Sequence, residues 1–153
     1  MIRTDAEYKK AQEKLGQEQE TLQRQREQLE EMDLSEEEVE RALEPMISFR
    51  DGLREEIETY ERMRRGDLSA FHDLRSIGQW LIGARIAKGW SLSRLADELG
   101  VSVQQVSRDE QNEYHGITTR RAQRILDALG VQFRLEIEEP ILEDEDTREA
   151  AAV

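Results

Sequence analysis

SLSRLADELGVSVQQVSRDEQN, residues 91–112, is the stretch that decides how the rest of the chain is interpreted. Apolar residues at positions 92, 95, 96 and 99 recur with helical spacing, and Val103 and Val106 begin a second periodic segment. Between the two segments, Gly100 stands where helices often end in the left-handed conformation, and Ser102 stands where a hydroxyl commonly caps the next helix. The stretch therefore predicts two short helices joined by a tight turn.

This pattern resembles the helix-turn-helix of the lambda-repressor-like (Xre/Cro-type) family of DNA-binding proteins. The resemblance covers residues 74–131, and its motif consists of Leu95, Ala96, Gly100, Val101, Ser102, Val106, Ser107, Arg108 and Glu110. It implies a domain of five short helices in which the third, residues 102–111, lies in the DNA major groove. The implied function is DNA binding.

The N-terminal side chains of a major-groove helix meet the base edges. In this chain the candidates are Ser102, Val103, Gln104, Gln105, Ser107 and Arg108. Gln104 suits a bidentate contact with adenine, Arg108 suits guanine, and Val103 suits a thymine methyl group. The alternative for the polar members of this set is an ordinary solvated position on a surface helix.

The resemblance also implies contacts with the DNA backbone and one buried ion pair. The implied phosphate contacts are Ser91, Arg94, Asn112, Tyr114 and Thr118, with Arg120 or Arg121. Leu92 departs from the family pattern, which often has glutamine there, and Glu113 would oppose a phosphate. Arg85 and Glu110 match a charged pair that many family members bury between the first helix and the end of the third, and each partner would be costly to bury alone.

Charge is distributed unevenly along the 153 residues, whose formal net charge is −13. Residues 1–66 hold 12 basic and 19 acidic side chains, residues 67–130 hold 8 of each, and residues 131–153 hold 2 basic and 8 acidic. Because the segment with the helix-turn-helix pattern is neutral, we expect modest nonspecific attraction to phosphate, and a dimer would double the contacts.

Residues 1–66 have the composition and spacing of a coiled coil. Apolar residues recur at intervals of three and four over residues 4–32 and again over residues 46–65. Ser35 and Glu38 form the pattern of a capping box, and Pro45 predicts either a kink or a new helix start. An antiparallel hairpin within the chain is the simplest arrangement, and a parallel coiled coil between chains is the alternative.

Residues 131–139 alternate apolar and polar side chains, which indicates a β-strand. Its apolar face consists of Val131, Phe133, Leu135 and Ile137. Since a single strand needs a partner, we expect it to pair with its copy in a homodimer. The acidic tail, residues 140–153, has too little apolar content to fold. The predicted organisation is therefore a hairpin (1–66), a helix-turn-helix domain (67–130), a dimerising strand and a tail, within an all-α fold class.

The sequence contains no cysteine, no pair of histidines at metal-ligand spacing and no long apolar stretch. We therefore predict no metal, no cofactor, no membrane association and no enzyme activity, and a cytoplasmic location. The predicted function is a homodimeric repressor that binds double-stranded DNA at a two-fold-symmetric operator. Two alternatives stay open: an antitoxin whose acidic N-terminal arm neutralises a basic ribonuclease toxin, and an adaptor that has lost DNA binding.

Overall fold

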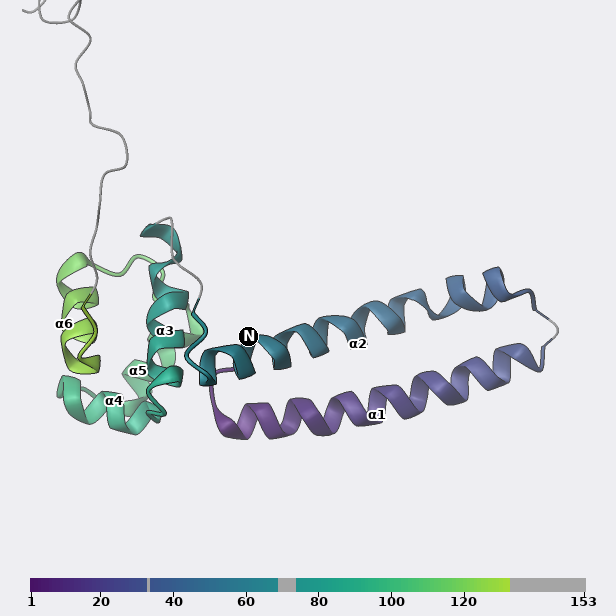
Figure 1. The fold of residues 1–153 in the computed structure, drawn as a ribbon, viewed down its shortest axis with the longest axis horizontal. Helices are drawn as coiled ribbons and strands as arrows, with labels where there is room; N and C mark the ends of the chain where they lie inside the picture. The colour runs from purple at the N-terminus through teal and green to yellow at the C-terminus, as the bar shows by residue number, and fades with distance from the viewer. Residues whose placement is uncertain (33, 69–73, 133–153) are drawn as a thin grey trace, which may run out of the picture.

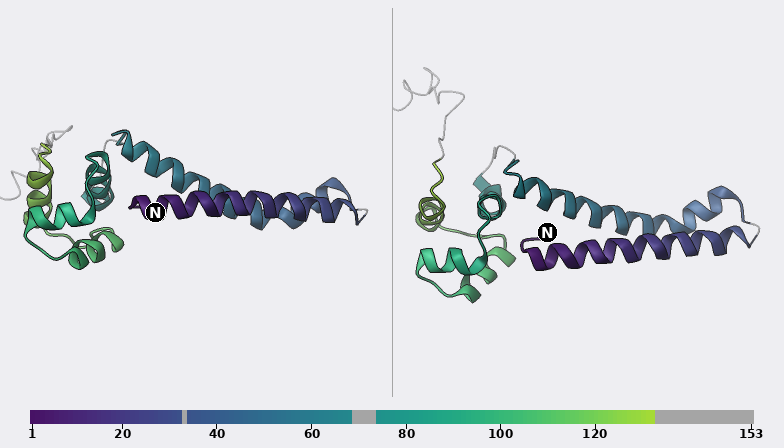
Figure 2. Two further views of the ribbon diagram at one scale, coloured as in Figure 1. Left: turned by 90° about the horizontal axis from the view of Figure 1, so that it is seen from below. Right: turned by 60° about the horizontal axis from the view of Figure 1, so that its bottom comes forward.

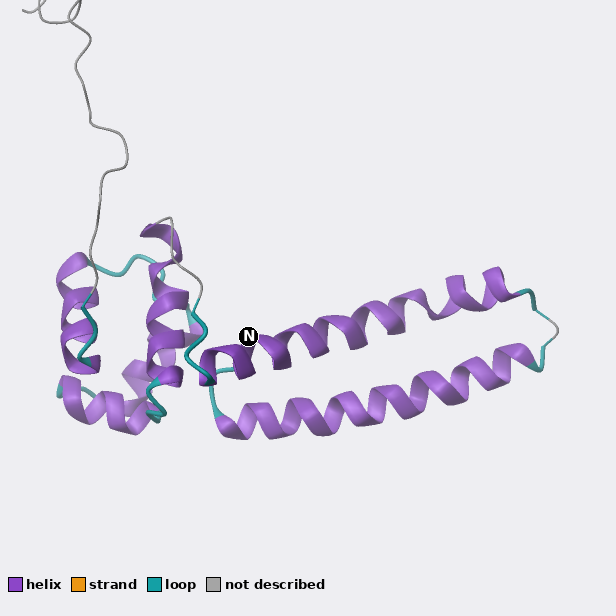
Figure 3. Ribbon diagram, in the orientation of Figure 1, coloured by secondary structure: helices purple, strands orange, loops and turns teal. Residues whose placement is uncertain are grey.

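The computed structural model describes residues 1–32, 34–68 and 74–132. In these ranges a long two-helix hairpin projects from one side of a small helical domain (Figure 1). Figure 3 shows helices and loops only in the described ranges, which agrees with the predicted all-α class. The predicted strand residues Phe133, Leu135 and Ile137 and the tail lie outside these ranges.

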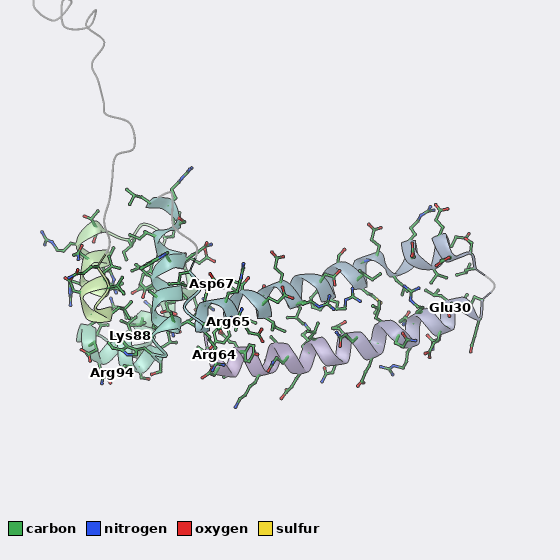
Figure 4. The ribbon with its side chains drawn as sticks, in the orientation of Figure 1. Glu30, Arg64, Arg65, Asp67, Lys88 and Arg94 are labelled. Atoms are coloured by element: carbon green, nitrogen blue, oxygen red, sulfur yellow. The ribbon has the colours of Figure 1, made fainter. Side chains whose placement is uncertain are left out.

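The hairpin consists of α1 (Asp5–Glu30) and α2 (Glu36–Arg64), packed antiparallel within one chain. Each helix begins with a capping box, formed by Thr4 with Glu7 and by Ser35 with Glu38, so the local sequence sets both starts. The intra-chain arrangement is therefore the one adopted. In Figure 4, Glu30 lies at the distal end of the hairpin, and Arg64 and Arg65 lie where it meets the domain.

Pro45 lies inside α2 and does not begin a new helix. A proline within a helix lacks an amide donor and its ring crowds the preceding turn, which kinks the helix. The first turns of α2 are accordingly angled relative to the rest (Figure 2). Of the two outcomes that the sequence left open, the kink is the one observed.

The domain contains the 3₁₀ turn η1 (Leu74–Ser76) and four α-helices: α3 (Ile77–Ala87), α4 (Leu92–Leu99), α5 (Val103–Gln111) and α6 (Thr119–Leu129). The described part of the domain thus has four α-helices where the resemblance implied five. α3 and α6 stand beside each other, with α4 and α5 across their ends (Figure 1).

Two apolar clusters hold the chain together. The smaller one lies toward the distal end of the hairpin around Leu22, Val39 and Leu43. The larger one joins the base of the hairpin, including Ile57 and Tyr60, to the buried side chains of the four domain helices. Because the second cluster contains side chains of both the hairpin helices and the domain helices, the hairpin packs directly on the domain.

Candidate nucleic-acid interface

The turn between α4 and α5 has the geometry that its residues predict. Gly100 ends α4 with φ +65°, a conformation that a side chain would strain. The Ser102 hydroxyl then accepts a hydrogen bond of 3.2 Å from the amide of Gln105 and caps α5. Leu95 and Val106, both fully buried, anchor the two helices on the core. These contacts fix the direction in which α5 presents its outer face.

That outer face carries the polar side chains expected to read bases. Gln104 and Arg108 are both exposed and lie four residues apart, so they stand on the same side of α5. Among the described residues, neither has a hydrogen-bond or ion-pair partner. Val103 is exposed beside them, and Ser107 is partly buried. The face therefore offers an amide, a guanidinium group and an apolar side chain to a ligand.

Gln105 and Arg121 have a partner inside the domain. The side-chain amide of Gln105 lies 3.1 Å from both terminal guanidinium nitrogens of Arg121, a distance at which its oxygen accepts hydrogen bonds. The same guanidinium pairs with the carboxylate of Asp109. Arg121 thus joins α6 to two turns of α5, and this role competes with the DNA contacts predicted for both residues.

Glu110 and Arg85 form the buried ion pair implied by the resemblance. Nε of Arg85 donates a hydrogen bond of 2.6 Å to Oε1 of Glu110, and Nη2 donates one of 2.6 Å to Oε2. Arg85 also donates to the carbonyls of Trp90 and Arg3, so its guanidinium is satisfied on three sides. The pair connects α3 to the last turn of α5 and sets the position of that helix.

Ser91 and Thr118, two of the expected phosphate contacts, act as helix caps. The Ser91 hydroxyl accepts from the amide of Arg94 at 3.1 Å, and the Thr118 hydroxyl accepts from the amide of Arg121 at 3.3 Å. Both remain exposed at helix N-termini, where backbone amides favour anions. Arg94, labelled in Figure 4, pairs with Glu98 and lies 5.2 Å from the centre of the Trp90 ring.

Tyr114 points into the domain and away from solvent. Its side chain is 5% exposed, and its hydroxyl has no hydrogen-bond partner in the described part of the chain. Burial raises the pKa of this hydroxyl well above its usual value. Tyr114 and Glu113 adopt left-handed φ angles of +53° and +49°, which turn the loop inward. In this conformation the Tyr114 hydroxyl does not reach a surface-bound phosphate, because the core encloses it.

Residues 82–135 match a family model described as helix-turn-helix. This segment is a helix-turn-helix domain of the lambda-repressor type. The match begins within α3, includes α4, α5 and α6, and extends past the last described residue. No match to a curated protein or to a solved structure was found. The family comprises DNA-binding regulators and is not a family of enzymes, which supports a DNA-binding role for this domain.

The helix-turn-helix domain also has a groove beside α5 whose lining includes several basic side chains. It is lined by Asp109, Asn112, Tyr114, His115, Gly116, Ile117, Thr118, Arg120, Arg121 and Arg124. Arg124 was not among the predicted site residues. Its position one helical turn after Arg120 places both arginines on the same face of α6, and this spacing could have identified it. Arg124 donates a hydrogen bond of 2.9 Å to the carbonyl of Leu99 and so ties α6 to the end of α4.

The remaining sequence predictions concern the strand that begins at Val131, metal binding and membrane association. Val131 packs against the core, and its amide donates to the carbonyl of Leu126 in the turn after α6. Residues 1–32, 34–68 and 74–132 contain no group of three side chains arranged to hold a metal ion. None of the described helices has the length and apolar content of a membrane span.

Proposed function

We propose that this protein is a sequence-specific transcriptional repressor that binds a two-fold-symmetric operator as a homodimer and reads bases with α5. The observation that carries the proposal is the pair Gln104 and Arg108, exposed on one side of α5 and unpaired among the described residues. A helix that is capped, anchored on a core and polar on its outer face is what major-groove recognition requires.

The chemistry of this face supports direct base reading. The Gln104 amide matches the donor and acceptor of adenine, and the Arg108 guanidinium matches the two acceptors of guanine. Val103 supplies an apolar surface for a thymine methyl group. Each bidentate contact contributes about 1–3 kcal/mol of discrimination between bases, so two of them are enough for useful selectivity.

Phosphate contacts would fix the orientation of the domain on the duplex. The capped N-termini of α4 and α6, at Ser91 and Thr118, offer backbone amides on the exposed surface. Arg120 and Asn112, exposed beside the groove, extend this set, and Arg94 joins it if its ion pair with Glu98 opens. Tyr114 does not belong to the proposed interface, because its hydroxyl is enclosed by the core.

The homodimer rests on the alternating pattern of residues 131–139. Of its apolar face only Val131 is among the described residues, and it packs against the domain's own core. To bind a two-fold-symmetric operator, the dimer must present its two copies of α5 to successive major grooves, about 34–36 Å apart. Because the domain of residues 67–130 is neutral, doubling the contacts is the simplest route to useful affinity.

Selection of bound duplexes from a random-sequence library tests this proposal. We expect an inverted repeat whose half-sites are separated by about one helical turn. Recovery of single half-sites with no symmetry would contradict the homodimer while retaining base reading. Recovery of no enriched sequence would contradict the operator function altogether and would favour the adaptor.

A second candidate, the antitoxin, is favoured by the outward face of α2. Opposite the buried side of this helix, six exposed carboxylates recur at helical spacing: Glu37, Glu40, Glu44, Asp51, Glu55 and Glu58. Such a row suits a basic protein surface electrostatically.

The test is co-purification with a small basic protein encoded beside this gene. Replacing the six acids by amides is expected to abolish the complex, whereas replacing Glu13, Glu20 and Glu27 of α1 is expected to preserve it. Loss in neither variant would contradict this role for α2.

A further inference from the structure

The first residues of the chain lie between the hairpin and the helix-turn-helix domain. Ile2 is 5% exposed and belongs to the apolar cluster that both parts share. Nη1 of Arg3 donates a hydrogen bond of 3.0 Å to the main-chain carbonyl of Glu110, and the carbonyl of Arg3 accepts one of 3.0 Å from Arg85. The first contact joins the start of the hairpin to the last turn of α5, and the second joins it to α3, whose Arg85 also pairs with Glu110.

The carbonyl that Arg3 contacts lies in the last turn of α5, which ends at Gln111. Carbonyl groups in the last turn of a helix lack an intrahelical partner and carry a partial negative charge, so a cation there is stabilising. The Glu110 carbonyl also accepts from the amide of Glu113 at 3.0 Å, and Arg3 adds a charged donor. Because the Arg3 side chain is only 19% exposed, water screens this interaction incompletely.

The base of the hairpin is also packed tightly against α3. A Cβ atom added at Gly83 would lie 3.6 Å from Cγ of Met63, at the base of α2, and 2.8 Å from Cδ2 of Leu68, which directly follows the hairpin. This close approach restrains the hairpin from a second direction. The hairpin from which Arg3 contacts α5 is therefore itself fixed against α3.

We propose that Arg3 is a positioning residue for the reading helix, which makes selective DNA binding depend on a hairpin side chain that touches no base. The inference rests on the proposed function, because it assigns a support to the same α5 that reads DNA. Arg3 acts at the C-terminal end of α5, whereas Gln104 and Arg108 lie in its first two turns. Loss of the contact lets the helix end fray and shift, and the reading side chains lose their alignment.

The test compares Arg3→Gln with Arg3→Lys in the full-length protein. Arg24→Gln, which changes an exposed arginine in the distal half of α1, is the control. The first readout is the affinity for a promoter fragment relative to a scrambled fragment. The second is hydrogen exchange at the amides of Glu113 and Tyr114, which bond to carbonyls in the last turn of α5.

We expect Arg3→Gln to lower the promoter-to-scrambled affinity ratio about fivefold or more and to leave affinity for scrambled DNA unchanged. Exchange at the two amides should accelerate, Arg3→Lys should recover part of both effects, and Arg24→Gln should change neither. A folded Arg3→Gln protein with wild-type selectivity and wild-type exchange would overturn the inference. If the wild type shows no selectivity, the proposed function fails, and the exchange measurement still decides whether Arg3 holds the end of α5.

Discussion

Arg85 and Glu110, 25 residues apart in the chain, meet in a bidentate ion pair whose side chains are 3% and 2% exposed. Its two hydrogen bonds of 2.6 Å connect α3, which packs on the hairpin, with the last turn of the proposed reading helix. The pair therefore connects the helix that packs on the hairpin, α3, with the helix proposed to read DNA, α5.

Removing one partner of this pair is expected to destabilise the protein more than removing both. Glu110→Leu leaves the Arg85 guanidinium buried without its main counterion, so the free energy of unfolding should fall by about 3–5 kcal/mol. In the double variant Arg85→Met, Glu110→Leu no charge remains buried, and a substantial part of this loss should be recovered. Urea unfolding followed by circular dichroism measures both values. A double variant less stable than Glu110→Leu would contradict this account of the pair.

Gly78 is expected to tolerate no side chain. A Cβ atom there would lie 1.8 Å from the carbonyl oxygen of Glu113, in the loop whose left-handed backbone directs Tyr114 inward. Gly78→Ala must displace backbone, and we expect it to lower the free energy of unfolding by about 3 kcal/mol. Gly52→Ala is the matched control, because Gly52 is also helical and has no atom within 4 Å of an added Cβ. It should stabilise the protein by about 0.5–1 kcal/mol. Equal effects of the two variants would contradict the predicted clash.

Tyr60 is expected to make the folded protein sensitive to alkaline pH. Its hydroxyl donates a hydrogen bond of 3.0 Å to Asp5, and burial, aided by that bond, raises its pKa to about 12. An unfolded tyrosine loses its proton near pH 10, so between about pH 10 and pH 12 the folded state binds more protons than the unfolded state. The stability contributed by this proton is therefore complete below pH 10 and is lost as the pH rises toward 12.

The absorbance of tyrosinate provides the measurement for Tyr60. In the native protein no tyrosine should ionise as early as in the unfolded chain, because a hydrogen bond to Glu61 raises the pKa of Tyr8 and burial raises the pKa of Tyr114. Tyr60→Phe should remove the step near pH 12 and reduce the decline of stability with pH. A native titration with one tyrosine near pH 10 that Tyr60→Phe eliminates would show that this hydroxyl is solvated.

Local sequence was sufficient for much of the fold. The glycine at 100 and the serine at 102 specify the turn before α5, because a left-handed helix end and a side-chain cap depend only on residues close in the chain. The same holds for the capping box predicted at Ser35. The apolar stripes predicted two packed helices, and the structure joins them as an antiparallel hairpin within one chain.

Contacts between residues far apart in the chain could not be predicted from local sequence patterns. Tyr114 follows a helix in a polar stretch, and its inward position depends on the gap that Gly78 leaves on another helix. Arg121 was expected at the phosphates, but Asp109 and Gln105 lie one helix away and engage it. The contact of Arg3 with Glu110 spans 107 residues and depends on the packing of the hairpin on the domain.

The most direct test of the proposed function is binding of the purified protein to its own promoter fragment and to a scrambled fragment over a salt series. The variant Gln104→Ala, Arg108→Ala should lose at least about 30-fold of the promoter preference, because two bidentate contacts are removed. The hairpin variant Gln23→Ala, Arg41→Ala, which changes the same residue types at exposed sites, should retain it. Promoter-selective wild-type binding that only the α5 variant loses is the predicted result. Equal affinity for both fragments at every salt concentration, or a folded α5 variant with undiminished preference, would contradict base reading by α5.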